Sequence, residues 1–239
     1  GCQLKPSGIY IQYVGIIKTK IHRSFTHVKT MSLTLKGNKL FINLHCEEIT
    51  GKLPKRNNSV GIDFGVQTTI TCSDGTTIKS PKLLKDKLKQ IQSCKRRKNY
   101  KALNHIYEKI RNKRKDFNHK LSRRIVDSYD IICIEDLQVN SIRSEKDIHN
   151  PARKRKAINR RLFDIGIKQL IEFIVYKAES AGKLVVKVNP AFTTQTCSNC
   201  KNISKIKITQ RKYVCSCGLS MNRDINAAIN IKTLGLESL

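Results

Sequence analysis

Tryptophan is absent from this chain, proline occurs only five times, and acidic residues are scarce, with 18 Asp and Glu against 47 Lys and Arg. No apolar run approaches the roughly 18 residues of a membrane-spanning helix, and no signal-peptide pattern is present. A membrane-spanning or secreted protein is therefore not expected. The basic excess gives a net charge of +29, whose field attracts phosphate polyanions. Nucleic acid is the predicted partner, in preference to a membrane surface.

The nine cysteines divide into a scattered group and a clustered group. A lysine-rich chain without a secretion signal fits a reducing, cytoplasmic interior, in which thiols bind metal or pack as apolar groups. Five cysteines occur singly and are expected to pack: Cys2, Cys46, Cys72, Cys94 and Cys133. The other four form two close pairs, Cys197-Ser-Asn-Cys200 and Cys215-Ser-Cys217. Two such pairs can close a tetrahedral Zn²⁺ site.

The first fifty residues favour β structure. Residues 28–35 and 40–46 are rich in β-branched and apolar residues, and 36–39 between them has the composition of a hairpin turn. The polar segment 53–59 indicates a domain boundary. Three antiparallel strands are then predicted, at 60–65, 68–72 and 76–79.

The rest of the chain alternates helical and strand patterns. Residues 81–126 are helical and strongly basic, with 95–98 linking two long helices. Residues 130–135 suit a buried strand, 158–181 an amphipathic helix that ends at Gly182, and 183–188 the next strand. The right-handed crossover rule makes these two strands parallel members of one sheet, so the fold class is α/β. The basic residues 153–156 and 160–161 fit either a solvated helix face or a phosphate contact.

Two carboxylates follow buried strands. Asp63 lies between Gly61 and Gly65, which lack a Cβ and would let backbone and phosphate come close. Glu135 ends the strand at 130–135. If these strands are neighbours, both acids emerge at the carboxyl edge of the sheet, where open α/β sheets bind ligands.

A third carboxylate, Asp224, lies near the start of a helix predicted from about residue 222 to 233, with Asn222 as a plausible N-cap. Three clustered carboxylates repel one another unless cations neutralise them, so Mg²⁺ or Mn²⁺ is the natural occupant. Two such ions can activate water for phosphodiester cleavage. Each acid taken alone is more typical of a turn or a cap.

Four motifs in this order resemble the TnpB (OrfB) proteins of insertion sequences, which are RNA-guided DNA nucleases related to compact type V CRISPR effectors. The motifs are Gly61-Ile-Asp-Phe-Gly65, Ile134-Glu-Asp-Leu137, Thr193-Thr-Gln-Thr-Cys-Ser-Asn-Cys200 and Arg223-Asp-Ile-Asn-Ala-Ala-Ile-Asn230. The resemblance covers essentially the whole chain. It implies a RuvC-type, RNase H-like nuclease that acts on DNA with a guide RNA and is associated with the nucleoid.

The resemblance also implies residue roles and domains. Asp63, Glu135 and Asp224 would be the catalytic, metal-binding triad, and the zinc ligands would be Cys197, Cys200, Cys215 and Cys217. Asp136 should point away, because adjacent strand residues alternate faces. The domains would be a β wedge-like (OB-like) remnant at 1–55, a nuclease core at 56–190 with a basic helical hairpin at 81–126, a zinc ribbon at 191–220 and a final nuclease segment at 221–239.

Three features depart from the family pattern. Family members usually carry a recognition region and most of a wedge domain before the position that is residue 1 here, and we expect both to be missing. Their absence would affect how the protein binds the guide RNA and recognises the target-adjacent DNA motif. The second cysteine pair is Cys-x-Cys rather than Cys-x-x-Cys, which should strain the second zinc knuckle. Asn222 occupies a position where an acidic residue is common.

Two alternatives to the endonuclease remain at this point. One is a truncated or repurposed nucleic-acid-binding protein that no longer cuts. The other is a transposase that joins strands itself, because that chemistry also uses two metals held by acidic residues. Tyr100, Tyr107 and Phe117 in the basic helices could stack on bases, but packing is the preferred interpretation.

Overall fold

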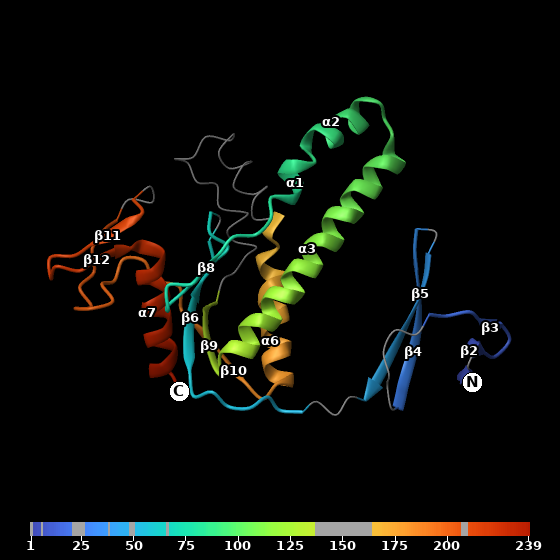
Figure 1. The fold of residues 1–239 in the computed structure, drawn as a ribbon, viewed down its shortest axis with the longest axis horizontal. Helices are drawn as coiled ribbons and strands as arrows, with labels where there is room; N and C mark the ends of the chain where they lie inside the picture. The colour runs from blue at the N-terminus through green and yellow to red at the C-terminus, as the bar shows by residue number, and fades with distance from the viewer. Residues whose placement is uncertain are drawn as a thin grey trace. The chain divides into compact units, whose positions relative to one another are not determined.

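The structure is a computed structural model that describes residues 2–5, 7–20, 27–37, 39–47, 51–65, 67–136, 164–206 and 210–239. It divides into two compact units, Gly1–Thr50 and Gly51–Leu239. Each unit is described by itself (Figure 1). Within the described residues, no helix combines the length and the apolar character that crossing a bilayer requires.

The first unit is built from β structure, as predicted. Strands β1 (Cys2–Lys5), β2 (Gly8–Ile11) and β3 (Gly15–Ile17) form an antiparallel sheet in the order β1-β2-β3. Strands β4 (His27–Lys36) and β5 (Lys39–Glu47) form the predicted hairpin, in which Lys36 pairs with Lys39. Gly37 in the turn has a φ of 59°, a left-handed conformation that glycine adopts without steric cost.

The second unit is centred on a five-stranded mixed sheet in the order β10-β9-β6-β7-β8. The strands are β6 (Ser59–Asp63), β7 (Ile70–Cys72), β8 (Thr77–Ile78), β9 (Ile131–Glu135) and β10 (Leu184–Val188). Strands β6, β9 and β10 are parallel, and β7 and β8 add to β6 in antiparallel fashion. The predicted parallel pairing of the strands at 130–135 and 183–188 is confirmed, and so is the antiparallel set that begins at residue 60.

One face of this sheet is covered by two helices, α3 (Tyr100–Ser128) and α6 (Ile167–Ser180) (Figure 1). Side chains of alternating strand residues point to this face, and together with apolar residues of both helices they form the main core. The strand residues are Val60, Ile62, Ile132 and Ile134, and the helix residues include Leu121, Ile125, Leu170 and Ile174.

The other face is covered by α7 (Arg223–Glu237), which lies very close to the strands. A Cβ added at Gly61 would lie 2.0 Å from the carbonyl oxygen of Ala228, and one at Gly235 would lie 2.4 Å from the sulfur of Cys133. The prediction that Gly61 and Gly65 make room for phosphate is therefore corrected. Gly61 makes room for helix α7, and a Cβ at Gly65 would meet the carbonyl oxygen of Thr68 at 2.6 Å.

The helical predictions need two corrections. The basic region contains two short helices, α1 (Leu83–Asp86) and α2 (Leu88–Arg96), before the long α3, so the break falls at residues 97–99 rather than 95–98. The helix predicted at 158–181 is interrupted at Gly166, whose φ of 65° is left-handed; residues 164–165 before it are helical, and α6 begins after it. Residues 158–163 and the basic residues at 153–156 and 160–161 lie outside the described residues.

The isolated cysteines pack, as expected, where their side chains are described. Cys72 and Cys133 are buried in β7 and β9, and Cys46 and Cys94 are half-buried. The side chain of Cys2 lies outside the described part of the chain.

Candidate active site and cysteine cluster

Asp63 and Glu135 end two neighbouring parallel strands. Ile62 of β6 is paired with Ile134 of β9, so the next residue of each strand is one of the two acids. Because strand side chains alternate, the neighbours of Ile62 and Ile134 point away from the α3–α6 core and toward α7. Asp224 is in the first turn of α7 itself. The fold thus places the three acids selected from the sequence near one edge of the α7 face, close enough for the charges of Glu135 and Asp224 to act on Asp63, although their oxygens are not as tightly grouped as the sulfurs of the cysteine cluster described below.

The electrostatics of Asp63 reflect this convergence. The pKa of Asp63 is raised from 3.8 to about 7, chiefly by burial and also by the nearby carboxylates of Glu135 and Asp224, against an opposing effect of Arg223. A largely buried carboxylate with two further carboxylates near it forms a site that binds cations when the carboxylates are ionised. The donor set consists of oxygen ligands, which suits Mg²⁺ or Mn²⁺.

Glu135 is 8% exposed and is held by Thr193, whose Oγ1 donates a hydrogen bond of 2.5 Å to Glu135 Oε1. Burial raises the pKa of Glu135, and the hydrogen bond from Thr193 opposes the shift because it stabilises the carboxylate. Thr193 is itself only 3% exposed. Its sequence motif was identified, but its contact with Glu135 was not predicted.

Asp224 carries two arginine contacts. Arg223 Nη2 lies 3.2 Å from Asp224 Oδ1, and Arg211 Nη1 lies 3.6 Å from Oδ2. Asn222 caps α7, as predicted, because its side-chain oxygen accepts a hydrogen bond of 2.8 Å from the backbone N–H of Asp224. The asparagine at this position therefore orders the backbone that carries the acid.

The four clustered cysteines come together beside this edge. The sulfur atoms of Cys197, Cys200, Cys215 and Cys217 all lie within 4.8 Å of one another. The Cys197–Cys217 and Cys200–Cys215 sulfur distances are 3.7 and 3.5 Å. Sulfurs at the corners of a Zn²⁺ tetrahedron with bonds of about 2.3 Å are about 3.8 Å apart, so the donor set and its size fit zinc. The Cys-x-Cys pair reaches the cluster with both of its thiols.

Short backbone turns support the cluster. Lys201, after the first pair, has a φ of 63° and donates its N–H to Cys197 O at 3.0 Å. Gly218, after the second pair, has a φ of 88° and donates to Cys215 O at 3.0 Å. The second pair lies between β11 (Lys212–Val214) and β12 (Ser220–Asn222), an antiparallel pair that leads into α7.

Two buried asparagines on α7 connect the cluster to the acids. Asn226 is 0% exposed and Asn230 is 3% exposed. Asn226 Oδ1 accepts from the N–H of Ser198, and the side chains of both asparagines donate to Thr196 O at 2.7 Å. Two asparagines four residues apart among alanines and isoleucines were the sequence signal that could have indicated this role.

Other sequence predictions concern side chains outside the acidic edge. Asp136 points away from the carboxylates and pairs with Lys187 at 3.6 Å on the surface. Tyr107 and Phe117 pack against apolar clusters, as predicted. Tyr100 does not follow the prediction, because it is 65% exposed.

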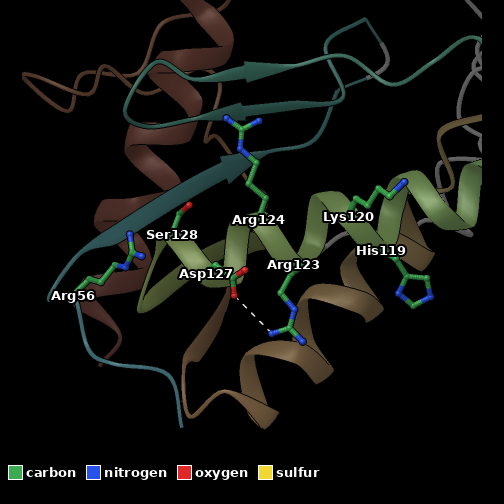
Figure 2. Close-up of a pocket in the computed structure, with 7 residues that line it drawn as sticks. All are labelled: Arg56, His119, Lys120, Arg123, Arg124, Asp127 and Ser128. Carbon is green, nitrogen blue, oxygen red and sulfur yellow. Dashed lines mark ion pairs between the residues drawn. The ribbon is translucent and has the colours of Figure 1, made fainter. Parts of the chain in front are cut away.

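A basic hollow of about 500 Å³ lies along α3, on the opposite side of the sheet from α7. Figure 2 shows the residues that line it: Arg56, His119, Lys120, Arg123, Arg124, Asp127 and Ser128. Asp127 pairs with Arg123 at 3.7 Å, which leaves the hollow with a net positive charge. Arg56 enters from the segment before β6, where its backbone N–H donates to Asp130 Oδ2.

Comparisons with known proteins agree with this architecture. Residues 43–145 match the family model OrfB_IS605, described as "Probable transposase", and residues 168–231 match "Cas12f1-like, TNB domain". A Streptomyces pristinaespiralis protein whose name includes the words RNA-guided DNA endonuclease is 28% identical over 217 residues, which cover 85% of this chain and 52% of that protein. The CRISPR-associated endodeoxyribonuclease Cas12f1 of Sulfoacidibacillus thermotolerans is 29% identical over 229 residues, with 85% and 52% covered.

The fold is also similar to a solved structure. The protein chain in a cryo-EM structure of a Cas12f1-sgRNA-target DNA complex superimposes with a TM-score of 0.56 at 19% identity, covering 91% of this chain and 72% of that one. The mixed α/β architecture is therefore a Cas12f1-like fold. The chain spans about half the length of the curated relatives that it matches.

Proposed function

The chain belongs to the TnpB (OrfB) family, and from this we propose that it is a transposon-associated, RNA-guided DNA endonuclease of the RuvC type. The observation that carries the proposal is the convergence of Asp63, Glu135 and Asp224 on the α7 face of the sheet. A mixed sheet with parallel strands at its centre and helices on both faces supports an RNase H-like core. DNA is the substrate and a guide RNA of the element is the partner.

The three carboxylates have distinct places in this site. Asp63 and Glu135 present oxygens from the sheet, and Asp224 presents oxygens from the start of α7. Mg²⁺ or Mn²⁺ bound by these oxygens would supply an activated water and a charge that stabilises the leaving oxygen of the phosphodiester. Arg211 and Arg223 offset the charge of Asp224, and guanidinium groups beside the site could also bind phosphate oxygens of the substrate.

The cysteine cluster is proposed to hold one structural Zn²⁺ through Cys197, Cys200, Cys215 and Cys217. All four positions are taken by sulfur, which is typical of a closed structural site rather than a catalytic one. The metal would stabilise a short ribbon that has only a small apolar cluster of its own, around the buried Tyr213.

Cleavage assays test the nuclease assignment directly. Guide-matched and single-stranded DNA would be incubated with Mg²⁺ and wild-type protein, Asp63→Ala or Glu135→Ala. Because such residues act as a unit, each substitution should remove most of the turnover. Asp116→Ala is a matched control, because Asp116 is an exposed acid that pairs with Lys120 on α3. Equal cleavage by all four proteins would refute the assignment.

The same preparations separate cutting from binding alone. Salt-dependent nucleic-acid binding that persists in EDTA, with no Mg²⁺-stimulated cleavage by the wild type, would select the binding-only alternative. Strand-transfer products on donor DNA would instead select a transposase.

Native mass spectrometry tests the zinc assignment. The wild type should carry one Zn²⁺, and Cys197→Ser should lose it or bind it more weakly. Cys94→Ser is the control, because Cys94 packs between helices away from the cluster. A wild-type ribbon that is folded and free of metal would contradict the proposal.

A further inference from the structure

A continuous set of buried and partly buried hydrogen bonds joins the cysteine cluster to Glu135. At one end, Asn226 Oδ1 accepts a bond of 2.9 Å from the N–H of Ser198, which lies between Cys197 and Cys200. Asn226 Nδ2 donates to Thr196 O at 2.7 Å. This end of the network fixes the first cysteine pair against α7.

The network continues one helical turn further along α7. Asn230 Nδ2 donates both to Thr196 O at 2.7 Å and to Thr193 O at 3.0 Å. Residues four apart on a helix lie on the same side, so the two amides hold the segment from Thr193 to Ser198 along one stripe of α7. Both amides are almost completely buried, and leaving either backbone acceptor unpaired there would be costly.

At the other end, the hydroxyl of Thr193 contacts the carboxylate. A threonine hydroxyl has one proton, and its two nearby acceptors are Glu135 Oε1 at 2.5 Å and Pro190 O at 3.3 Å. The shorter distance identifies Glu135 as the acceptor. Within the described residues, Glu135 Oε2 has no hydrogen-bond partner, so one oxygen is oriented and the other is available to an ion.

We infer that Thr193 is a positioning residue for Glu135, and that Asn226 and Asn230 connect it to the cysteine cluster, so that order in the cluster sets the divalent-ion affinity of the carboxylate site. The inference rests on the proposed function, because it takes the three carboxylates as an ion site. Helix α7 is the common element, since it carries Asp224 and both asparagines. Residues that orient metal-binding carboxylates commonly change metal affinity by about 10- to 100-fold when they are replaced.

Equilibrium binding of Mn²⁺ to the zinc-loaded protein tests the inference without relying on cleavage. Thr193→Val keeps the shape of the side chain and removes the hydroxyl, and it should weaken Mn²⁺ binding by about 10- to 100-fold. Thr193→Ser keeps the hydroxyl and should restore most of the affinity. Thr233→Val makes the same chemical change on α7, at a hydroxyl that bonds only Ile229 O among the described residues, and should bind Mn²⁺ as the wild type does.

Asn226→Ala tests the connection to the cluster with two measurements on one protein. It should weaken both zinc retention, followed by native mass spectrometry, and Mn²⁺ affinity. Loss of zinc retention with unchanged Mn²⁺ affinity would overturn the connection, and wild-type Mn²⁺ affinity in Thr193→Val would overturn the role of Thr193. If Asn226→Ala does not fold, the comparison of Thr193→Val with Thr193→Ser still decides that role.

Failure of the proposed function would look different. In that case the wild type and Asp63→Ala would bind Mn²⁺ equally or not at all, whereas failure of the inference alone leaves wild-type binding strong and dependent on Asp63. Circular dichroism spectra and thermal unfolding of every variant establish that changes in affinity are measured on folded protein.

Discussion

The two faces of the five-stranded sheet are built in different ways. On the face toward α3 and α6, large aliphatic side chains fill the space between strands and helices. On the face toward α7, glycines let helix and strands approach closely, and the buried groups include the carboxylate of Glu135 and two asparagine amides. The first face stabilises the fold by apolar burial, and the second fixes functional groups by close approach and hydrogen bonding. The residues that stabilise the fold and the residues of the proposed active site thus lie on opposite faces of the same sheet.

The largest expected effect on stability is on the α3–α6 face. Ile174 of α6 is 0% exposed in the main core. Ile174→Ala should lower the free energy of unfolding by about 2 to 5 kcal/mol, because it removes buried methyl groups and leaves a cavity. Chemical denaturation measures this, with Leu236→Ala, at a 39% exposed position, as control. Mn²⁺ affinity of the folded variant should stay at the wild-type value, and a parallel loss of affinity would break the separation of the two faces.

A smaller loss of stability is expected on the α7 face, with a larger effect on ion binding. Gly61→Ala places a methyl group 2.0 Å from Ala228 O, so α7 must move away from β6. We expect a loss of about 1 to 3 kcal/mol in the free energy of unfolding and a severe loss of Mn²⁺ affinity, since Asp224 moves with the helix. Gly51→Ala is the matched control, because a Cβ there meets nothing within 4 Å. Unchanged Mn²⁺ binding by Gly61→Ala would show that close approach of α7 is unnecessary for the site.

A pH-dependent gain in stability is expected from Asp63→Asn in buffer without added divalent ions. The folded protein holds the Asp63 proton more tightly than the unfolded chain, because the pKa of Asp63 is raised from 3.8 to about 7. The loss of the Asp63 proton should therefore lower the free energy of unfolding of the wild type as pH rises from about 4 to 7. Asp63→Asn should match the wild type at pH 4 and be more stable by about 1 to 3 kcal/mol at pH 8.

Urea denaturation at the two pH values checks this prediction. Asp116→Asn, an exposed acid on α3, should show no such gain. The same titration predicts that Mn²⁺ binding weakens as pH falls below about 7, because an ion must then displace the Asp63 proton. A stability curve for Asp63→Asn that runs parallel to that of the wild type would show that burial and the neighbouring carboxylates do not raise the pKa of Asp63.

The smallest effect on stability is expected in the basic hollow. Arg124 lines it, and Arg124→Glu should hardly change the free energy of unfolding. It should weaken nucleic-acid binding and reduce the slope of log affinity against log salt by about one, if Arg124 contacts a phosphate. Arg124→Lys keeps the charge and should keep the slope. Fluorescence anisotropy over a salt series measures both, and an unchanged slope in Arg124→Glu would remove the hollow from the nucleic-acid surface.

Much of the sheet could be predicted from short sequence patterns. The apolar run ending at Glu135 has few alternatives to a buried strand, and the crossover rule fixes the direction of its partner. Asp63, Glu135 and Asp224 could be selected as candidate catalytic residues because each ends a predicted strand or starts a predicted helix. The order of their motifs also matched that of a known family. The acids can converge only if β6 and β9 are neighbours in the sheet. The sequence was consistent with that pairing but did not establish it.

The support of the site could not be predicted in the same way. Thr193 and Glu135 are 58 residues apart, and nothing in either segment reveals the contact before the chain folds. Gly61 is predicted to leave room for phosphate because it lacks a Cβ and lies two residues before Asp63, whereas in the structure α7 occupies that space. The interruption of the helix just before α6 is at one left-handed residue, Gly166, which periodicity alone does not detect.

The junction between β12 and α7 has a consequence for how this chain can vary in length. Strand β12 ends at Asn222 and α7 begins at Arg223, so no linker separates the ribbon from the helix that carries Asp224. One inserted residue there would turn the ribbon by about 100° relative to the helix axis, because an α-helix has about 3.6 residues per turn. Length changes that preserve the geometry of the acids must therefore fall elsewhere, for example in the segment between Cys200 and β11.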